Sequence, residues 1–292
     1  MQYEGNIFRP PSEAYSLIVQ ATIGCAHNEC TFCSMFKDKQ FRIRKVSEVI
    51  ADLEEARGYY SNVGRIFLAD GDALVLKQEE LLEILLKIQT LFPECARVGI
   101  YGSPQDVLRK GVSDLAALKT AGLGIVYIGA ESGSDRILKQ IKKGATAAEI
   151  TEAIKTIEAS GVDASATFIS GLAGADEADW REHAEATGRM ISAAQPSYVG
   201  LLTLMVEPLA PIHEEIRAGR FKLLSPEGVV AETLLLLENT NVTKDCVFRS
   251  NHASNYLSLK GTLPGDKARM IRQLTDALGG KYGLKDERLR ML

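Results

Sequence analysis

One short segment, GCAHNECTFCSM at residues 24–35, holds three of the five cysteines of this 292-residue chain. Cys25, Cys30 and Cys33 follow the spacing C-x4-C-x2-C, and His27 lies between the first two. Thiolate and imidazole groups are side chains that bind zinc and iron–sulfur clusters in proteins. The segment therefore predicts a metal centre.

Two kinds of centre fit this segment. The first is a zinc site, structural or catalytic, with four ligands: Cys25, His27, Cys30 and Cys33. Structural zinc sites, however, usually draw two ligands from each of two separated segments, and here all four lie in one loop. The second is an iron–sulfur cluster held by the three cysteines with one iron left open, whereas electron-transfer clusters normally have four cysteine ligands. A non-catalytic iron–sulfur carrier is a third interpretation.

Six apolar, β-branched runs, each followed by a segment of helical spacing, are expected to position this loop. The strands are predicted at residues 15–24, 65–71, 97–102, 124–131, 162–171 and 198–207. The clearest helices are predicted at residues 77–92, 112–122 and 146–161, the last with a capping box from Thr146 to Glu149. Repeated strand and helix units predict a parallel sheet, either open and doubly wound or closed into an incomplete barrel.

In both architectures the chemistry belongs at the carboxyl ends of the strands. The cysteine loop follows the first predicted strand, and the polar or glycine-containing segments DGDA, YGSPQD, ESGSD, SGLAG and EPLAP follow the other five. One edge of the sheet is therefore predicted to carry the site.

Residues 223–292 lose this alternation and are predicted as an extension packed on the same domain as the core, residues 1–222. An apolar helix is expected at residues 228–240, a polar loop at 246–256 and a final helix at 266–278.

The composition is that of a folded globular protein, with 46% hydrophobic and 25% charged residues. A net charge of -4 without a long basic run argues against a nucleic-acid surface. No apolar run reaches the ~18 residues of a membrane span and no signal-peptide pattern is seen, so a cytoplasmic protein without membrane contact is expected. The isolated Cys95 and Cys246 are interpreted as structural thiols.

Together these motifs resemble the radical S-adenosylmethionine (SAM) superfamily over residues 15–210. Phe32, an aromatic residue directly before the last cysteine, also matches the family pattern. The segment IGAESGSDRILKQIKKGAT at residues 128–146 is similar to the branch that contains oxygen-independent coproporphyrinogen oxidases and methylthiotransferases. The resemblance implies an α/β fold, a partial (βα)6 TIM-like barrel with a helical C-terminal extension.

The family mechanism implied by the resemblance uses an oxygen-sensitive 4Fe-4S cluster on Cys25, Cys30 and Cys33, with SAM on the open iron. Reductive cleavage of SAM would give a 5'-deoxyadenosyl radical that abstracts hydrogen from the substrate. The electron would come from a donor such as flavodoxin or ferredoxin.

The resemblance also implies a set of cofactor contacts, which are Phe32, Gly71, Asp72, Ala73, Glu131, Thr167, Ile169 and Gly171. Gly71-Asp72-Ala73 stands where the family usually has Gly-Gly-Glu, so Asp72, with Asp70 as second candidate, would receive the methionine ammonium group. Glu131 would face the ribose or the amino-acid end, and TFISGLAG at residues 167–174 would support the adenine. Lys143 is a further candidate, for the cofactor carboxylate.

Substrate contacts are expected opposite the cluster. The candidates are Tyr101, Gln105, Glu207, Arg249, Asn251, His252, Asn255 and Tyr256. Residues 249–256, RSNHASNY, show no helical or strand period, which fits either a loop that closes the barrel or an ordinary surface loop. No segment for a cobalamin, a macromolecular substrate or a further cluster is apparent, so a small-molecule substrate is expected. The reaction that follows hydrogen abstraction stays open.

Overall fold

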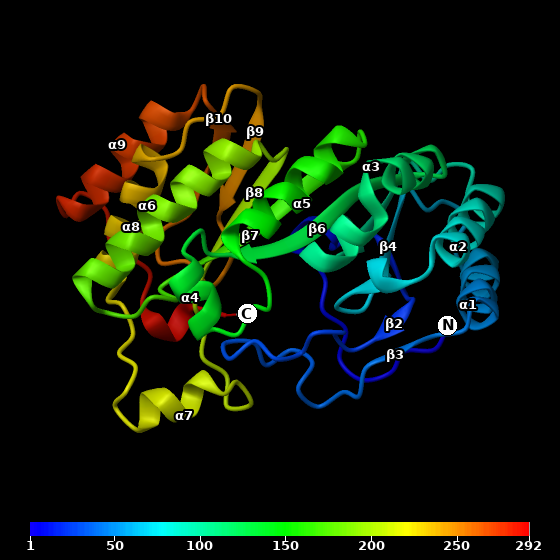
Figure 1. Ribbon diagram of the computed structural model, residues 1–292, viewed down its shortest axis with the longest axis horizontal. Helices are drawn as coiled ribbons and strands as arrows, with labels where there is room; N and C mark the ends of the chain where they lie inside the picture. Colours follow the sequence, from blue (N-terminus) through cyan, green and yellow to red (C-terminus); the bar gives the residue numbers. More distant parts are fainter. Residues whose placement is uncertain (292) are drawn as a thin grey trace. The chain divides into compact units, whose positions relative to one another are not determined.

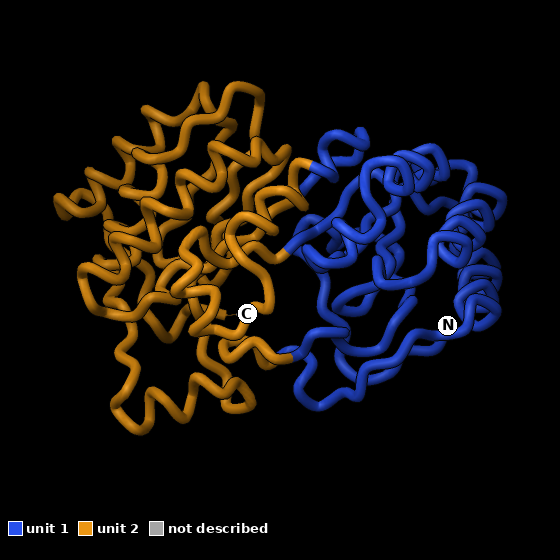
Figure 2. Tube along the Cα trace, in the orientation of Figure 1, with its two compact units in different colours: residues 1–28, 35–128, 156–164 blue, residues 29–34, 129–155, 165–292 orange. Residues whose placement is uncertain are grey.

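The computed structural model describes residues 1–291 and divides them into two compact units (Figure 2). Unit 1 comprises residues 1–28, 35–128 and 156–164, and unit 2 comprises residues 29–34, 129–155 and 165–292. The cysteine loop therefore contributes Cys25 to unit 1, and Cys30 and Cys33 to unit 2.

Unit 1 is built on parallel strands in the order β1-β4-β5-β6 (Figure 1). These strands are β1 (Leu17–Gln20), β4 (Arg65–Ala69), β5 (Arg97–Tyr101) and most of β6 (Leu123–Glu131). Successive side chains of β4, namely Ile66, Phe67 and Leu68, are fully buried. A strand covered on both faces reads as such a continuous apolar run, and each buried side chain of this size contributes roughly 1.5–3 kcal/mol.

Helices and short elements complete unit 1. The helices are α1 (Val46–Tyr59), α2 (Gln78–Leu91) and α3 (Pro104–Thr120), and α2 packs on both of the others. The short elements are the 3-10 helices η1 (Pro11–Glu13) and η2 (Ala73–Val75) and the antiparallel pair of β2 (Thr22–Ile23) and β3 (Arg42–Ile43). Because β2 and β3 pair, they join the two ends of the segment that contains the cysteines.

Unit 2 has the strand order β7-β8-β9-β10. Its strands are β7 (Asp163–Ser170), which starts in unit 1, β8 (Tyr198–Thr203), β9 (Cys246–Ser250) and β10 (Leu259–Leu263). β7, β8 and β9 are parallel, and β10 runs antiparallel to β9. Its helices are α4 (Asp135–Gln140), α5 (Ala147–Ala159), which ends in unit 1, α6 (Glu177–Ala194), α7 (Ile212–Arg217), α8 (Pro226–Glu238) and α9 (Lys267–Leu278), with η3 (Glu287–Leu289) near the C-terminus. α8 packs between α6 and α9.

The strand and helix pattern expected from the sequence agrees with these elements, and the α/β class with a mostly parallel sheet is confirmed. The predicted capping box is present, since Thr146 Oγ1 donates to Glu149 Oε2 at 2.8 Å and accepts the Glu149 N–H at 3.2 Å. Among the described residues, no helix is long and apolar enough to cross a membrane.

Two segments differ from the sequence expectation. Helix α3 is broken at Gly111, whose φ of 68° and ψ of 179° are not helical, so its second part begins at residue 112 as the sequence predicts. The part that the sequence did not predict begins at Pro104, because the Ser103 side chain caps it by accepting the Asp106 N–H and proline suits a first helical turn. The polar loop expected at residues 246–256 begins as strand β9, which has alternate buried side chains and pairs with β8 and β10. The C-terminal extension therefore adds strands as well as helices. Residues 165–222 and 223–292 share unit 2, and the domain boundary at residue 222 stays a prediction.

Candidate functional site

The cysteine loop is tied to the end of β4 at the residues directly before Cys25. The Asp70 carboxylate accepts the Gly24 N–H at 3.0 Å and pairs with Lys39 at 2.7 Å. The Gly71 N–H donates to the Gly24 carbonyl oxygen, also at 3.0 Å. Because the Asp70 side chain is fully buried, these bonds are shielded from water and hold the loop entrance on unit 1.

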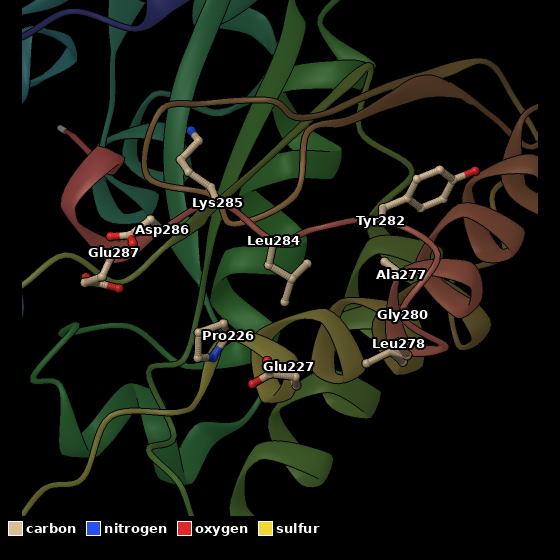
Figure 3. A pocket seen from close by; sticks show the side chains of 10 residues that line it. All are labelled: Pro226, Glu227, Ala277, Leu278, Gly280, Tyr282, Leu284, Lys285, Asp286 and Glu287. Carbon is tan, nitrogen blue, oxygen red and sulfur yellow. The ribbon is translucent and has the colours of Figure 1, made fainter.

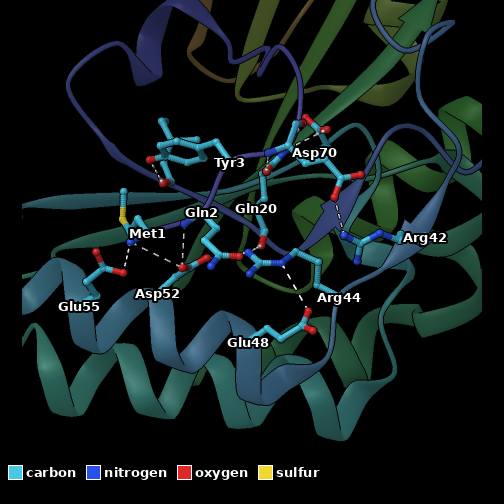
Figure 4. A network of polar contacts seen from close by, with 12 residues as sticks. Met1, Gln2, Tyr3, Gln20, Arg42, Arg44, Glu48, Asp52, Glu55 and Asp70 are labelled. Atoms are coloured by element: carbon cyan, nitrogen blue, oxygen red, sulfur yellow. Dashed lines mark hydrogen bonds and ion pairs between the residues drawn. The ribbon is translucent and has the colours of Figure 1, made fainter.

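Residues of the N-terminal segment form hydrogen bonds with the end of β1, the strand before the cysteine loop (Figure 4). The Gln20 side chain accepts the Glu4 N–H at 2.8 Å and donates to the Glu4 carbonyl oxygen at 3.2 Å. Arg44 donates to the Gln20 carbonyl oxygen at 2.8 Å and pairs with Asp52 at 2.7 Å, while Asp52 also accepts the Gln2 N–H at 3.0 Å. The end of β1 is thus held by two separate segments, through Glu4 and Arg44, and Asp52 connects these two segments.

Gly71 packs against Cys25 with no space for a side chain. A Cβ at residue 71 would lie 3.0 Å from the Cys25 Cβ and 2.6 Å from the Phe36 ring. Phe36 is itself buried and meets Phe8 edge to face. Glycine, which the sequence predicts as a cofactor contact here, lets the backbone after β4 approach the first cysteine.

The middle of the cysteine loop is bound by elements of unit 2 that the sequence did not connect with it. The Thr31 N–H donates to the Ile141 carbonyl oxygen at 2.9 Å, and the Thr31 carbonyl oxygen accepts the Ile212 N–H at 2.8 Å. Ile141 ends α4 and Ile212 begins α7. Cys30, Phe32 and Cys33 around this residue are half-buried.

Asp72 lies 2% exposed at the start of η2, next to the fully buried Ala73. Its Oδ1 accepts the Ser103 N–H at 3.1 Å. Burial, followed by the hydrogen bond and charge of the neighbouring Asp106 carboxyl, raises the pKa of Asp72 well above its usual range. The raised pKa favours the protonated form of Asp72, whose side chain connects the end of β4 with the start of α3. Its role toward a methionine ammonium group stays a prediction.

Glu131 ends β6 in an ion pair with Lys143, with Oε1 and Nζ 3.0 Å apart. Both side chains are largely buried, at 10% and 13% exposure. The pair lies over Gly129, where a Cβ would come within 2.2 Å of Glu131 Oε1 and 2.9 Å of Lys143 Nζ. Glu131 adopts a positive φ of 65°, which turns the chain sharply out of the strand. The two candidates that the sequence named separately are thus in contact.

The cofactor contacts predicted on β7 share one face of the strand. Thr167 and Ile169 are half-buried, whereas their neighbours of even number are buried. Gly171, at a φ of 85°, ends the strand and donates its N–H to Glu232 on α8 at 2.8 Å. Sequence reasoning missed Glu232, although an acid between the apolar stretches VVA and LLLL of α8 was a signal that it has a buried partner.

Three substrate candidates lie at strand ends. Tyr101 ends β5 and packs edge to face against Phe67 and Tyr127, with ring centroids 5.0 and 6.0 Å away. Gln105 is exposed in the first turn of α3, and Glu207 is half-buried after β8.

Two of the predicted substrate contacts near the C-terminus, Asn255 and Tyr256, are held by hydrogen bonds of their side chains. Asn255 is buried, donates to the Leu201 carbonyl oxygen and accepts from the Thr203 hydroxyl, both at 2.9 Å. The Tyr256 hydroxyl accepts from Arg290 at 2.6 Å. The bonds of these two side chains hold the loop on β8 and on the C-terminal segment.

Arg249, Asn251 and His252 complete the set. Arg249 is an outward residue of β9 that donates to the Gly261 carbonyl oxygen at 3.0 Å. Asn251 is exposed, and His252 is half-buried with its Nδ1 2.9 Å from the Ser254 hydroxyl. His252 Nδ1 also accepts the Ser254 N–H at 3.2 Å, whereas Asn251 is exposed to solvent.

A surface hollow of about 590 Å³ lies in unit 2 between the first turn of α8 and residues 277–287 (Figure 3). Lys285 in its wall donates to the Ala253 carbonyl oxygen at 3.0 Å. None of the predicted cluster, cofactor or substrate residues lines this hollow.

The donor set of the loop fits an iron–sulfur cluster. The loop supplies three half-buried thiols, and Gly71 and Asp70 hold the backbone at the first of them. Within residues 1–291, no three His, Cys, Asp or Glu side chains are grouped closely enough to hold a metal ion. The assignment of the cysteines therefore rests on their chemistry and spacing.

The family model of the radical SAM superfamily matches residues 19–187. A methyltransferase of uncharacterised specificity from Pyrococcus horikoshii is 32% identical over 58% of this chain and 35% of its own length. The anaerobic magnesium-protoporphyrin IX monomethyl ester cyclase of Cereibacter sphaeroides is 27% identical over 66% of this chain and 31% of its own. The chain thus spans about a third of the length of these relatives.

Solved structures show the same fold. A radical SAM methyltransferase from Kitasatospora setae, solved with cobalamin and a 4Fe-4S cluster, covers 74% of this chain and 43% of its own, with a TM-score of 0.55 and 18% identity. Methylornithine synthase covers 78% and 63%, with a TM-score of 0.53 and 14% identity. The partial barrel expected from the sequence is confirmed by this likeness. Since the family model covers more than half of the chain, the protein belongs to the radical SAM superfamily, whose members use a 4Fe-4S cluster and SAM.

Proposed function

We propose that this chain is a radical SAM enzyme that binds a 4Fe-4S cluster through Cys25, Cys30 and Cys33 and abstracts hydrogen from a small-molecule substrate. The bound cluster and SAM would supply the reductive cleavage that yields a 5'-deoxyadenosyl radical. The observation that carries the proposal is the three-cysteine loop, clamped at its start by Asp70 and Gly71, in a chain that matches the family over residues 19–187.

The residues of this chain would contribute to the reaction first by holding the cysteine loop in one conformation. Three thiolates would hold the cluster and leave one iron for the cofactor. The buried pair of Asp70 and Lys39 keeps Gly24, and with it the neighbouring Cys25, in one backbone position. Such order matters because a radical reaction needs donor and acceptor at a fixed short separation.

Glu131 and Lys143 are proposed to orient the cofactor at the end of β6. Their ion pair is largely buried but not fully closed, so the second carboxylate oxygen can accept from a ribose hydroxyl or an ammonium group. Lys143 holds the carboxylate in place and offsets its charge. The half-buried face of β7, with Thr167 and Ile169, is proposed to lie along the adenine.

The substrate and the reductant are proposed by class. The net charge of -4 and the absence of a long basic run favour a small molecule over a nucleic acid. Asn251 and His252 are the candidates of the polar loop that remain available for a substrate, and Tyr101 is the aromatic candidate. A small acidic electron carrier of the flavodoxin or ferredoxin class is proposed as donor.

The experiment that tests this function is anaerobic reconstitution, with electron paramagnetic resonance of the dithionite-reduced protein and an assay for 5'-deoxyadenosine. We expect about four iron atoms per chain, a cluster signal that changes on addition of SAM, and 5'-deoxyadenosine. Cys30→Ala should abolish all three, whereas the control Cys95→Ala should retain them.

The zinc interpretation makes the opposite forecast for the same samples. Stoichiometric zinc without an iron–sulfur signal, lost in His27→Ala as well as in Cys30→Ala, would overturn the proposed function. A cluster that forms but never yields 5'-deoxyadenosine or responds to SAM would instead indicate an iron–sulfur carrier.

A further inference from the structure

A buried polar network in unit 2 binds the backbone at the end of β7. His183 on α6 and Glu232 on α8 are 1% and 0% exposed. The His183 Nε2–H donates to the Ile169 carbonyl oxygen at 3.2 Å, and Glu232 Oε2 accepts the Gly171 N–H at 2.8 Å. Two helices therefore hold consecutive peptide groups of the segment to which the adenine is assigned.

The bonds of His183 define its protonation. Nε2 must carry a hydrogen because its partner is a carbonyl oxygen, so Nδ1, 2.7 Å from the Ser132 hydroxyl, accepts. Ser132 Oγ in turn accepts the Ser134 N–H at 3.0 Å. Burial lowers the pKa of His183 to about 4, against the opposing influence of the Ile169 bond and of Glu182. His183 is therefore neutral at physiological pH and links the end of β7 to the turn after β6.

Glu232 is held as a neutral acid. Burial raises its pKa to about 8, although the Gly171 N–H and the nearby Ser170 hydroxyl oppose this rise. Its other oxygen, Oε1, has no hydrogen-bond partner among the described residues, and the ionisable group that faces it, His183, lies 3.9 Å away. An ionised carboxylate here would be poorly solvated, so the proton stays on Glu232 below about pH 8.

Gly188 lets α6 and α8 approach closely enough for this network. A Cβ at residue 188 would lie 2.6 Å from the Leu236 carbonyl oxygen and 2.8 Å from the Asn239 Cβ. The helices consequently touch backbone to backbone one turn beyond His183 and Glu232.

We propose that His183 and Glu232 are positioning residues that fix the peptide groups of residues 169–171 and thereby set the affinity for SAM. β7 ends at Ser170, so the Gly171 N–H lies beyond the strand ladder and has Glu232 as its acceptor. Without that acceptor the turn at Gly171, which has a positive φ of 85°, would lose its anchor. The inference rests on the proposed function, because it assumes that this segment contacts the cofactor.

The test uses three variants of the reconstituted holoenzyme. Glu232→Gln keeps an oxygen for the Gly171 N–H but cannot ionise, and Glu232→Leu removes the acceptor. Leu236→Ala removes a buried apolar side chain from the same helix and leaves both residues of the network in place. It is the matched control for a loss of stability alone. SAM affinity is measured by equilibrium binding from pH 6 to 9, and hydrogen exchange at residues 169–172 is measured on the protein before reconstitution.

We expect Glu232→Leu to weaken SAM binding by about tenfold at every pH and to speed exchange of the Gly171 amide, because a lost buried hydrogen bond is of that order. The wild type should lose affinity as pH rises through 8, because the ionised and poorly solvated Glu232 favours an opened turn that admits water, whereas Glu232→Gln cannot ionise and should keep its affinity. Leu236→Ala should melt earlier with unchanged affinity.

Two results would overturn the inference while leaving the function in place: equal affinity losses in Glu232→Leu and Leu236→Ala, or the same pH profile in wild type and Glu232→Gln. Failure of the wild type itself to bind SAM would instead contradict the proposed function. If Glu232→Leu does not fold, the comparison of wild type with Glu232→Gln still decides, since that exchange preserves the side-chain shape and the acceptor.

Discussion

At the scale of single residues, the cysteine loop depends on a glycine that leaves no space for a methyl group. Gly71→Ala would place a Cβ 2.6 Å from the Phe36 ring and 3.0 Å from the Cys25 Cβ. We expect a loss of about 1–3 kcal/mol in the free energy of unfolding and a lower iron content after reconstitution, because the first cysteine must move. Gly64→Ala, with nothing within 4 Å of the added Cβ, is the control. Equal iron content in both variants would contradict this expectation.

A second residue-scale prediction compares a buried ion pair with an exposed one. Lys39→Met leaves the fully buried Asp70 carboxylate without its cation, so we expect a loss of about 3–5 kcal/mol in the free energy of unfolding. Arg42→Met removes a pair of similar length, 2.6 Å, whose side chains are 49% and 59% exposed, and should cost less than about 1 kcal/mol. Urea unfolding of both proteins checks the difference, and similar losses would show that burial is not the cause.

At the scale of elements, the strands and helices were predictable because the spacing of apolar residues follows the buried face of each element. β4 is a continuous apolar run, and α5 carries its capping box in the sequence. β9 was read as a loop because its exposed positions, among them Arg249, obscure a short alternation.

The site could be predicted only in part, for a related reason. The cysteines and Glu131 are visible because their residue types and spacing carry chemistry on their own. The bonds of Thr31 to α4 and α7, and of Gly171 to Glu232, join residues far apart in the chain through backbone groups. Almost every residue has the same backbone N–H and C=O groups, so a bond to the backbone does not require a particular residue type. Sequence patterns therefore do not reveal such bonds.

An element-scale prediction concerns the contact of η2 with α3. The folded protein keeps the Asp72 proton that the unfolded chain releases near the usual pKa of 3.8, so its free energy of unfolding should fall as pH rises from about 4 through the raised pKa. Asp72→Asn keeps an acceptor for Ser103 and removes this fall, so its stability relative to wild type should increase by up to about 1.4 kcal/mol per pH unit in that range. Unfolding measured from pH 4 to 8 checks the slope. An unchanged SAM affinity in the same variant would remove Asp72 from the predicted cofactor contacts.

At the scale of the whole molecule, the C-terminal residues are part of the structure of unit 2. Arg290 is 8% exposed, donates to the carbonyl oxygens of Leu204 at 2.8 Å and Ser254 at 2.6 Å, and lies over the Tyr256 ring at 4.2 Å. It therefore connects the end of β8 with the polar loop predicted to approach the substrate.

The corresponding prediction compares two arginines of the same segment. Arg290→Met leaves buried carbonyl acceptors without donors and should lower the free energy of unfolding by at least about 2 kcal/mol. Arg288→Met is the control, because that side chain is 89% exposed. Thermal unfolding monitored by circular dichroism measures both. An equal melting temperature for the two variants would mean that the contacts of Arg290 add nothing to stability.

The close approach of α6 and α8 at Gly188 limits which amino-acid substitutions this protein can accept during evolution. With carbonyl and Cβ atoms less than 3 Å from where any side chain would begin, a saturation library should return glycine alone at this position among folded clones. His183 and Glu232 should tolerate only replacements that keep the Ile169 carbonyl oxygen and the Gly171 N–H bonded, as Glu232→Gln does. Related chains could then be recognised by an acid in the middle of the apolar helix together with this glycine, even where the rest of the helix surface differs.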